Sequence, residues 1–157
     1  MALYYFDSSS MVKLYVQEPG TEQVIRIAAS SAANQIATSV LTRLEIRSAL
    51  TRKLRRNEIS RQDSELAMQL LEDHWKSRFV RQPVSDLLLD HACTLLEKHG
   101  LRAYDAVQLA SCLAIQRTAL ASQTFVTFVC SDTLLCDAAA AEGLIATDPE
   151  DSTDTPL

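Results

Sequence analysis

Four acidic residues of the chain lie at the ends of apolar strands or within apolar helices, as the sequence predicts these elements. They are Asp7, Glu45, Asp105 and Asp132. Moving an ionised carboxylate out of water is costly unless a cation or hydrogen-bond donors compensate it. Packed together without a cation, four carboxylates would repel one another and retain protons. A hard divalent cation such as Mg²⁺ or Mn²⁺, which prefers oxygen ligands, is the simplest compensator that all four could share.

Two of these acids also have an ordinary structural alternative. Asp7 and Asp132 each precede a predicted helix, where an Asp side chain commonly serves as the N-cap. The neighbouring hydroxyls of residues 8–10 and of Ser131 could provide the same cap. We therefore expect the serines that follow Asp7 to cap the first helix and to leave the Asp7 carboxylate available for another role, whereas Asp132 and Ser131 are both candidates for the cap of the later helix.

The other two acids lie inside predicted helices. Glu45 shares a helix face with Leu41 and Ala49, and most of the basic residues of that helix lie off this face. A salt bridge from Glu45 to one of those basic residues is the alternative. Asp105 begins the segment DAVQLASCLAI, which is apolar all round and therefore predicts a buried helix. Arg102 could pair with Asp105, but it would equally suit a bound phosphate.

Strands alternate with helices along the chain. Strands are expected at residues 3–6, 35–38, 79–82, 124–130 and 144–146, of which 79–82 could instead be a connector. Helices are expected at residues 11–16, 21–30, 41–56, 60–78, 83–100, 103–117 and 133–142. This order predicts an α/β fold with a parallel sheet covered on both faces, and ligands in such sheets bind beyond the carboxyl ends of the strands.

Composition predicts one compact domain. The chain has 157 residues, 47% of them hydrophobic, with only 3 Gly and 4 Pro. No apolar run reaches the roughly 18–20 residues that span a bilayer, and the start MALYYFDSSS does not resemble an export signal, so a cytoplasmic location without membrane contact is expected. The four cysteines lie in apolar segments without C-x-x-C spacing and are expected to be buried, reduced thiols.

The net charge of −5 does not exclude a nucleic-acid partner, because its distribution is uneven. Residues 148–157 contain four acidic residues and no Lys or Arg, and we expect them to form a disordered tail after a domain at residues 1–147. Without the tail the charge is −1, and a cation that neutralised the four candidate acids would leave a surface that need not repel phosphate.

In order along the chain, four segments resemble the PIN domain, and more narrowly the VapC toxin ribonucleases of toxin–antitoxin pairs. They are YFDSSSMVKLYVQEPG, SVLTRLEIRSAL, LRAYDAVQLA and FVCSDTLLCDAAAAEGL, which together span roughly residues 3–147. The resemblance implies a three-layer α/β/α domain with a central parallel sheet of four or five strands. It also implies an endoribonuclease that uses Mg²⁺ or Mn²⁺ to activate water.

The resemblance assigns roles to individual residues. The four acids would hold the metal and be catalytic, and Ser9 would orient Asp7 or a metal-bound water. Many members of the family have Ser or Thr two places before the last acid, where this chain has Cys130. Asp137 is a further acid in this region whose position among alanines is also typical of a solvated helix face.

Substrate and partners follow in the same way. Lys13, Arg102 and the basic residues between 43 and 56 are candidates for phosphate contacts, with an ordinary exposed helix face as the alternative for the last group. The resemblance implies an RNA substrate, a homodimer and a small antitoxin partner. Leu66, Leu70, Leu71 and Trp75 form a stripe that could bind that partner or pack in the core. The competing functions are a non-catalytic PIN-like interaction module and an Asp-dependent phosphohydrolase.

Overall fold

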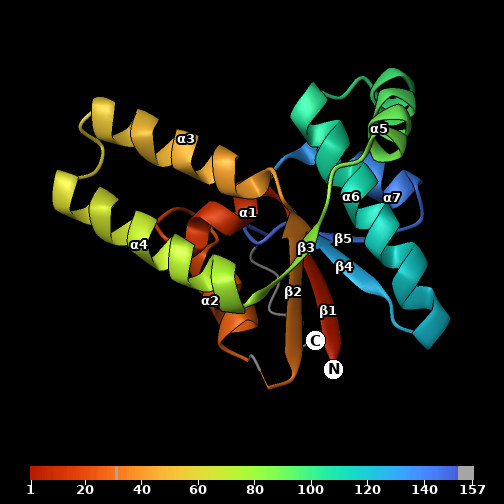
Figure 1. Ribbon diagram of the computed structural model, residues 1–157, viewed down its shortest axis with the longest axis horizontal. Helices are drawn as coiled ribbons and strands as arrows, with labels where there is room; N and C mark the ends of the chain where they lie inside the picture. Colours follow the sequence, from red (N-terminus) through yellow and green to blue (C-terminus); the bar gives the residue numbers. More distant parts are fainter. Residues whose placement is uncertain (31, 152–157) are drawn as a thin grey trace.

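Within residues 1–30 and 32–151, which the computed structural model describes, five strands form one parallel sheet in the order β3-β2-β1-β4-β5 (Figure 1). The strands are β1 (Ala2–Phe6), β2 (Asn34–Ser39), β3 (Phe79–Gln82), β4 (Val126–Val129) and β5 (Ile145–Thr147). All four neighbouring pairs are parallel. The predicted α/β class and the five-stranded parallel sheet are confirmed.

Helices connect the strands and cover the sheet. They are α1 (Ser8–Met11), the 3-10 turn η1 (Val12–Leu14), α2 (Thr21–Ala29), α3 (Thr42–Arg55), α4 (Arg61–Ser77), α5 (Asp86–His99), α6 (Ala103–Ala119), the 3-10 turn η2 (Leu120–Ser122) and α7 (Thr133–Ala141). Among the described residues no helix is long and apolar enough to cross a membrane.

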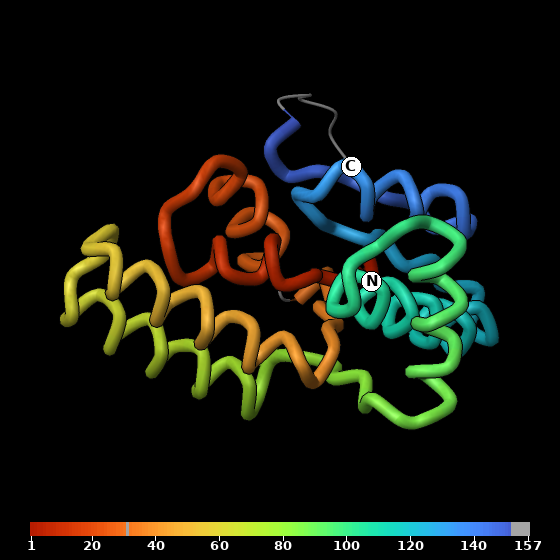
Figure 2. Tube along the Cα trace, turned by 90° about the horizontal axis from the view of Figure 1, so that it is seen from above, coloured from red at the N-terminus to blue at the C-terminus, as the bar shows by residue number. Residues whose placement is uncertain are grey.

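The alternation of side chains along β1 divides the interior into two cores. Tyr5 packs with residues of α5, α6 and α7 on one face of the sheet. Tyr4 and Phe6 pack on the opposite face with residues of α1, α2, α3 and α4. The result is the three-layer α/β/α arrangement that the resemblance implied, and Figure 2 shows the α3–α4 pair extending to one side and α5, α6 and α7 lying on the other.

Local capping residues mark the ends of several helices. The side chains of Ser60 and Ser85 accept hydrogen bonds from the backbone N–H groups of Asp63 and Leu88 and so cap α4 and α5. Gly100 ends α5 in the left-handed conformation, with φ 68°. The helix predicted at 11–16 is wrong in its bounds, because the α-helical turn already begins at Ser8 and the remainder is 3-10.

The cysteines differ from the prediction of four buried, reduced thiols. Cys130, at the end of β4, and Cys136, in α7, form a disulfide, so the prediction is wrong for this pair. Cys93 is exposed, and only Cys112 is both free and buried among the cysteines. Sequence spacing did not reveal the pair because the contact depends on how the β4–α7 loop turns.

The first residues of the predicted acidic tail pack against the domain. Pro149 is buried beside Gly20, whose φ is +83° and where an added Cβ would lie 2.8 Å from the Pro149 carbonyl oxygen. The Lys13 Nζ donates to Glu150 Oε1 at 2.8 Å. The rest of the predicted tail, residues 152–157, lies outside the described residues.

Candidate active site

The four candidate acids come from four different elements at the carboxyl-terminal edge of the sheet. Asp7 directly follows β1, and Asp132 follows β4 and precedes α7. Glu45 lies in the first turn of α3, which follows β2, and Asp105 lies in the first turn of α6. Because β1 and β4 are parallel neighbours, the residues that follow them meet at the edge where ligands of such sheets bind.

Asp7 is held by a short network of hydrogen bonds. Its Oδ1 accepts from the Ser10 N–H at 2.8 Å, and the Ser9 Oγ lies 2.8 Å from both of its carboxylate oxygens. The Ser9 Oγ also accepts from the Ser131 N–H at 3.0 Å, which joins the loop after β1 to the loop after β4. Ser9 therefore lies where the predicted role of orienting Asp7 requires it.

The prediction that serines would cap α1 in place of Asp7 is wrong, and of the two candidates for the cap of α7 the structure has Asp132 rather than Ser131. Asp7 is the N-cap of α1, and Asp132 is the N-cap of α7, where its Oδ1 accepts from the Leu135 N–H at 2.9 Å. A carboxylate has about four lone-pair positions, so one capping bond leaves capacity for a further ligand. Capping and ligand binding are thus compatible at both positions.

Asp7 is only 4% exposed, and its burial determines its protonation. Loss of hydration raises the pKa of the Asp7 carboxyl to about 6, although hydrogen bonds from Ser10 and Ser9 act in the opposite direction. Among the residues that the structure describes, no Lys, Arg or His forms an ion pair with this carboxylate. Asp7 is therefore a buried acid that has no cationic partner within residues 1–30 and 32–151.

Glu45 is positioned by Gln108, a residue that was not among the predicted site residues. The Gln108 Nε2 donates to Glu45 Oε1 at 2.7 Å and lies 2.9 Å from both the Ser8 Oγ and the Thr42 Oγ1. Its Oε1 accepts from the Tyr5 hydroxyl at 2.6 Å. The Gln108 side chain is 2% exposed and links β1, α1, α3 and α6 through this network.

A signal for Gln108 was present in the sequence. It is the sole amide in the apolar segment of α6 and lies three residues after Asp105, on the same helix face. A buried amide needs partners for its donors and acceptor, and such partners are found where polar groups from several elements meet. That requirement could have identified Gln108 as part of the site.

Burial and neighbouring charges raise the pKa values of both Glu45 and Asp105. Burial raises the pKa of Glu45, and the nearby Asp105 charge raises it further. Burial likewise raises the pKa of Asp105, the Asp132 charge adds to this, and Arg102 acts in the opposite direction. The alternative of a salt bridge from Glu45 is not found among the described residues, since Arg43 and Arg47 pair with Glu72 of α4.

Cys130 and Asp137 are the two further residues of this region to which the sequence drew attention. Cys130 is bonded to Cys136, and its sulfur lies 3.7 Å from the Asp132 backbone oxygen rather than on the carboxylate. It therefore does not replace the hydroxyl that many members of the family have at this place. Asp137 is exposed on α7, as expected for a solvated helix face.

The carboxylates suit a hard cation by their chemistry, but they do not form a closed cage. Among residues 1–30 and 32–151, no group of three or more Asp, Glu, His or Cys side chains lies close enough together to hold a metal ion. Mg²⁺ usually takes one or two carboxylates and retains several waters, so a closed cage is not needed. That all four acids share one ion stays a prediction, and the buried, uncompensated Asp7 is the observation that fits a cation.

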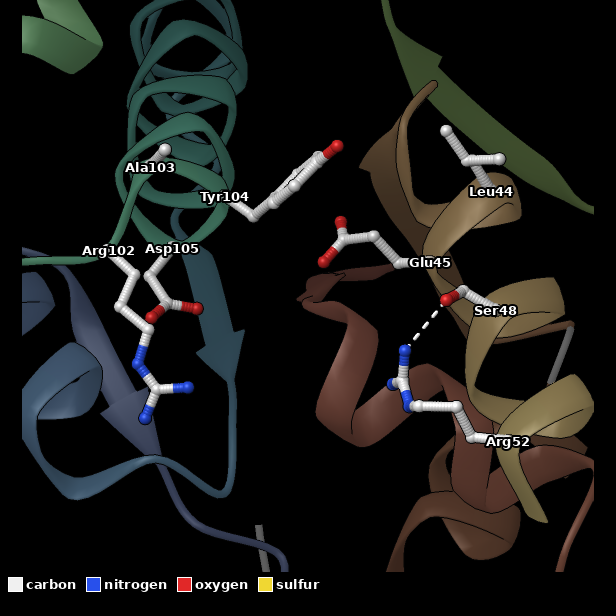
Figure 3. A pocket seen from close by; sticks show the side chains of 8 residues that line it. All are labelled: Leu44, Glu45, Ser48, Arg52, Arg102, Ala103, Tyr104 and Asp105. Atoms are coloured by element: carbon white, nitrogen blue, oxygen red, sulfur yellow. Dashed lines mark hydrogen bonds between the residues drawn. The ribbon is translucent and has the colours of Figure 1, made fainter. Parts of the chain in front are cut away.

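A pocket of about 480 Å³ opens beside two of the acids, between α3 and the start of α6 (Figure 3). It is lined by Leu44, Glu45, Ser48, Arg52, Arg102, Ala103, Tyr104 and Asp105. Arg102, one of the predicted phosphate contacts, thus lies at the site. Lys13, the other, is buried and donates to the Pro19 carbonyl and to Glu150, so its ammonium group is directed to structural partners.

Comparison with known proteins identifies the family of the chain. The model of the PIN domain family matches residues 4–123. Two relatives from Mycobacterium tuberculosis, ribonuclease VapC45 of strain CDC 1551 and ribonuclease VapC49 of strain H37Rv, are each 33% identical over 117 residues, which covers 73% of this chain and 78% of each relative.

Solved structures share the fold. FitAB bound to an IR36 DNA fragment aligns with a TM-score of 0.63 at 14% identity, covering 98% of this chain and 99% of that chain. VapBC2 from Rickettsia felis, bound to a DNA fragment from its promoter, gives 0.56 at 16% identity, covering 93% and 98%. A toxin–antitoxin complex from Klebsiella pneumoniae gives 0.54 at 19% identity, covering 95% and 98%.

Proposed function

This chain belongs to the PIN domain family, and we propose that it is a VapC-type endoribonuclease that hydrolyses RNA with the help of a divalent cation, Mg²⁺ or Mn²⁺. The PIN match and the two ribonuclease relatives support the nuclease activity. The acidic edge of the sheet supports the metal requirement, and nucleases of this family generally depend on a divalent metal. The observation that carries the proposal is the buried Asp7 carboxylate, which no cationic side chain of the described residues neutralises.

Each residue of the edge has a role in this proposal. Asp7, Glu45, Asp105 and Asp132 would hold the cation, directly or through water. Ser9 fixes the orientation of the Asp7 carboxylate and, through the Ser131 N–H, its distance from the loop that carries Asp132. Gln108 fixes the Glu45 carboxylate and stabilises its ionised form by donating a hydrogen bond to it.

The reaction is the hydrolysis of a phosphodiester bond. A bound divalent cation supplies a water of lowered pKa and charge neutralisation at the phosphate. Addition of water in line with the leaving 3′ oxygen gives a 5′-phosphate and a 3′-hydroxyl. The 2′-hydroxyl does not take part, so preference for RNA must arise from contacts made by the residues around the edge.

Chelation and substitution test the function together. EDTA should abolish cleavage of RNA by the purified chain, and added Mn²⁺ or Mg²⁺ should restore it. Asp105→Asn should remain inactive with either metal while keeping the native far-ultraviolet circular dichroism spectrum. Cleavage that persists in EDTA, or an Asp105→Asn variant as active as the native chain, would refute the metal-dependent mechanism.

We also propose that the chain is the toxin of a toxin–antitoxin pair that acts in the cytoplasm as a homodimer. The solved structures that share its fold include toxin–antitoxin complexes. The predicted stripe on α4 divides in a way that suits a partner, since Leu71 and Trp75 are buried and Leu66 and Leu70 are exposed. Co-expression with the protein encoded beside it should suppress RNA cleavage, and Leu66→Asp with Leu70→Asp should relieve that suppression.

A further inference from the structure

The pocket between α3 and α6 has three zones that the reaction alone does not explain. In Figure 3 the Tyr104 ring and Leu44 lie at one end, the Glu45 and Asp105 carboxylates lie in the middle, and Arg52 and Arg102 lie at the other end. The volume of about 480 Å³ is within the range of about 300–1,000 Å³ that small-molecule sites occupy. An aromatic face, an acidic middle and a cationic end match the parts of a nucleotide whose phosphate is bound by arginines and faces the acids.

Tyr104 is presented rigidly to solvent. It lies in the first turn of α6, whose following residues are buried nearly all round and therefore fix the helix in place. Its own side chain is 51% exposed and points across the pocket toward α3 (Figure 3). A large ring that is half exposed on a rigid helix costs little conformational entropy when it stacks on a ligand.

The two arginines are available for anions. Arg52 is directed into the pocket, where its Nη1 donates to the Ser48 Oγ at 2.7 Å. Arg102 precedes α6 and, within residues 1–30 and 32–151, forms no hydrogen bond or ion pair through its side chain. Arg43 and Arg47, by contrast, are committed to Glu72 on the other side of α3. Arg52 and Arg102 are the two arginines that line the pocket, and both can bind phosphate there.

Resting on the proposed ribonuclease activity, we infer that this pocket is the nucleotide subsite that selects the RNA on either side of the cut. A nucleobase next to the scissile phosphate stacks on Tyr104 against Leu44, and Arg52 and Arg102 bind the phosphate on the opposite side of the acids. Stacking on an aromatic side chain does not need a particular base, whereas two arginines at one end set the direction in which the strand lies. Tyr104 is thus a substrate-positioning residue of the reaction that does not distinguish one base from another.

The test for stacking uses short single-stranded RNA that spans a cut site mapped by sequencing RNA ends, and a matched RNA that lacks the base beside the cut. Tyr104→Ala should raise KM for the complete RNA by roughly 5- to 150-fold with a smaller change in kcat, whereas Tyr104→Phe should retain native KM. The KM of the native enzyme should be higher by a similar factor for the RNA without the base. Tyr104→Ala should have the same KM for both RNAs. Phe125→Ala, which removes a 64% exposed ring outside the pocket, is the matched control and should behave as the native chain.

The arginine end is tested by the salt dependence of binding. Binding of labelled RNA is measured by fluorescence anisotropy in the inactive Asp7→Asn background, as a plot of log affinity against log salt concentration. Arg52→Gln and Arg102→Gln should each make the negative slope of this plot shallower by about 0.7. Arg117→Gln, an exposed arginine in the last turn of α6, should leave the slope unchanged.

The outcomes separate the subsite from the ribonuclease itself. If Asp105→Asn is inactive and Tyr104→Ala keeps native KM on both RNAs, the subsite is wrong while the ribonuclease stands. If Tyr104→Phe raises KM as much as Tyr104→Ala does, the hydroxyl rather than the ring makes the contact, and stacking is refuted. If Asp105→Asn cleaves RNA as the native chain does, the ribonuclease mechanism itself fails.

Discussion

Asp7 serves two functions with one side chain, because it caps α1 and is the most deeply buried of the candidate ligands. Asn keeps an oxygen that can accept the Ser10 N–H, whereas Ala removes both the acceptor and the charge. Asp7→Asn should therefore abolish RNA cleavage without weakening the fold. Asp7→Ala should also be inactive and should unfold at lower denaturant, with a free energy of unfolding about 1 kcal/mol below that of Asp7→Asn.

Urea unfolding of the two variants in EDTA checks this prediction. Equal stability of the Asn and Ala variants would show that the capping hydrogen bond contributes nothing at this position. Substantial cleavage by Asp7→Asn would remove this carboxylate from the proposed metal ligands.

Gln108 acts on the site only through Glu45, so it is a positioning residue. Gln108→Leu keeps the approximate volume but leaves the Tyr5 hydroxyl and the Glu45 carboxylate without their partner in a buried network. Stability should fall by about 1–3 kcal/mol, since buried polar groups would lose their hydrogen bonds. The Glu45 pKa should rise further because a donor that favours the ionised form is lost.

A pH profile distinguishes this role from a purely structural one. In Gln108→Leu the acidic limb of kcat/KM should move to higher pH and kcat should fall more than KM changes. A variant that is less stable but keeps the native pH profile would show that Gln108 supports only the fold.

At the scale of single residues the sequence identified charged groups better than neutral ones. Four carboxylates in apolar segments are conspicuous because each is costly alone. Gln108 is costly for the same reason but carries no charge, and its partners lie 63 to 103 positions away in the chain. The charge of Lys13 suggested a phosphate contact. Its hydrogen bond to Glu150 could not be predicted from the sequence, because Glu150 lies 137 positions away in the chain.

The apolar residues of helix α4 are divided between the buried core and the exposed surface. Leu71 is fully buried in the core below the sheet, while Leu66, five positions earlier, is 56% exposed. Leu71→Ala should lower the free energy of unfolding by about 2–5 kcal/mol, because it removes packed methyl groups and leaves a cavity. Leu66→Ala should change it by less than about 0.5 kcal/mol.

Thermal or urea unfolding of both variants provides the measurement. A large decrease in the free energy of unfolding of Leu66→Ala would indicate that the exposed part of α4 is covered in solution, as in a homodimer. Size-exclusion chromatography of the same variant would then show a change in oligomeric state.

At the scale of elements, hydrophobic periodicity and capping residues placed nearly every helix and strand. The errors fall at ends, where the deciding contacts are not local. Strand β4 begins at Val126 rather than at Thr124, because pairing with β1 starts at the register Leu3↔Val126. The start of α1 was misplaced because the capping group proved to be Asp7, which had been reserved for another role.

For the whole molecule, the raised carboxyl pKa values determine how stability depends on pH when no metal is bound. The pKa of Asp7 is about 6 in the folded chain, against about 3.9 when unfolded, so between these values the folded state binds the extra proton. This contribution is fully present below about pH 4 and is lost as the pH rises through about 6, an effect of about 3 kcal/mol. Glu45 and Asp105 act in the same direction.

Chemical unfolding in EDTA at a series of pH values tests the prediction. The free energy of unfolding should fall between about pH 4 and pH 7 in the native chain, and the fall should be smaller in Asp7→Asn. Added Mg²⁺ should raise the stability of the native chain at pH 7 and have less effect on the variant. An identical pH dependence in the two proteins would contradict the assignment to Asp7.

The parallel sheet and its ligand-binding edge could be predicted from the sequence, whereas the distances between the acidic side chains could not. Alternating strands and helices require a parallel sheet with its ligand edge at the strand ends, and that logic places Asp7 and Asp132 together. It does not specify that the carboxylates stop short of a closed cage, because side-chain distances depend on packing that periodicity does not encode.

The central position of β1 in the sheet has a consequence for synthesis. The loop after β1 needs the loop after β4 as its neighbour, and Asp7 and Asp132 are separated by most of the chain. A ribosome that adds about 5–20 residues per second needs roughly 6–25 s to travel between these two codons. During translation the nascent polypeptide therefore carries the first acid without the last, and a cell that makes this nuclease is exposed to it only as each molecule nears completion.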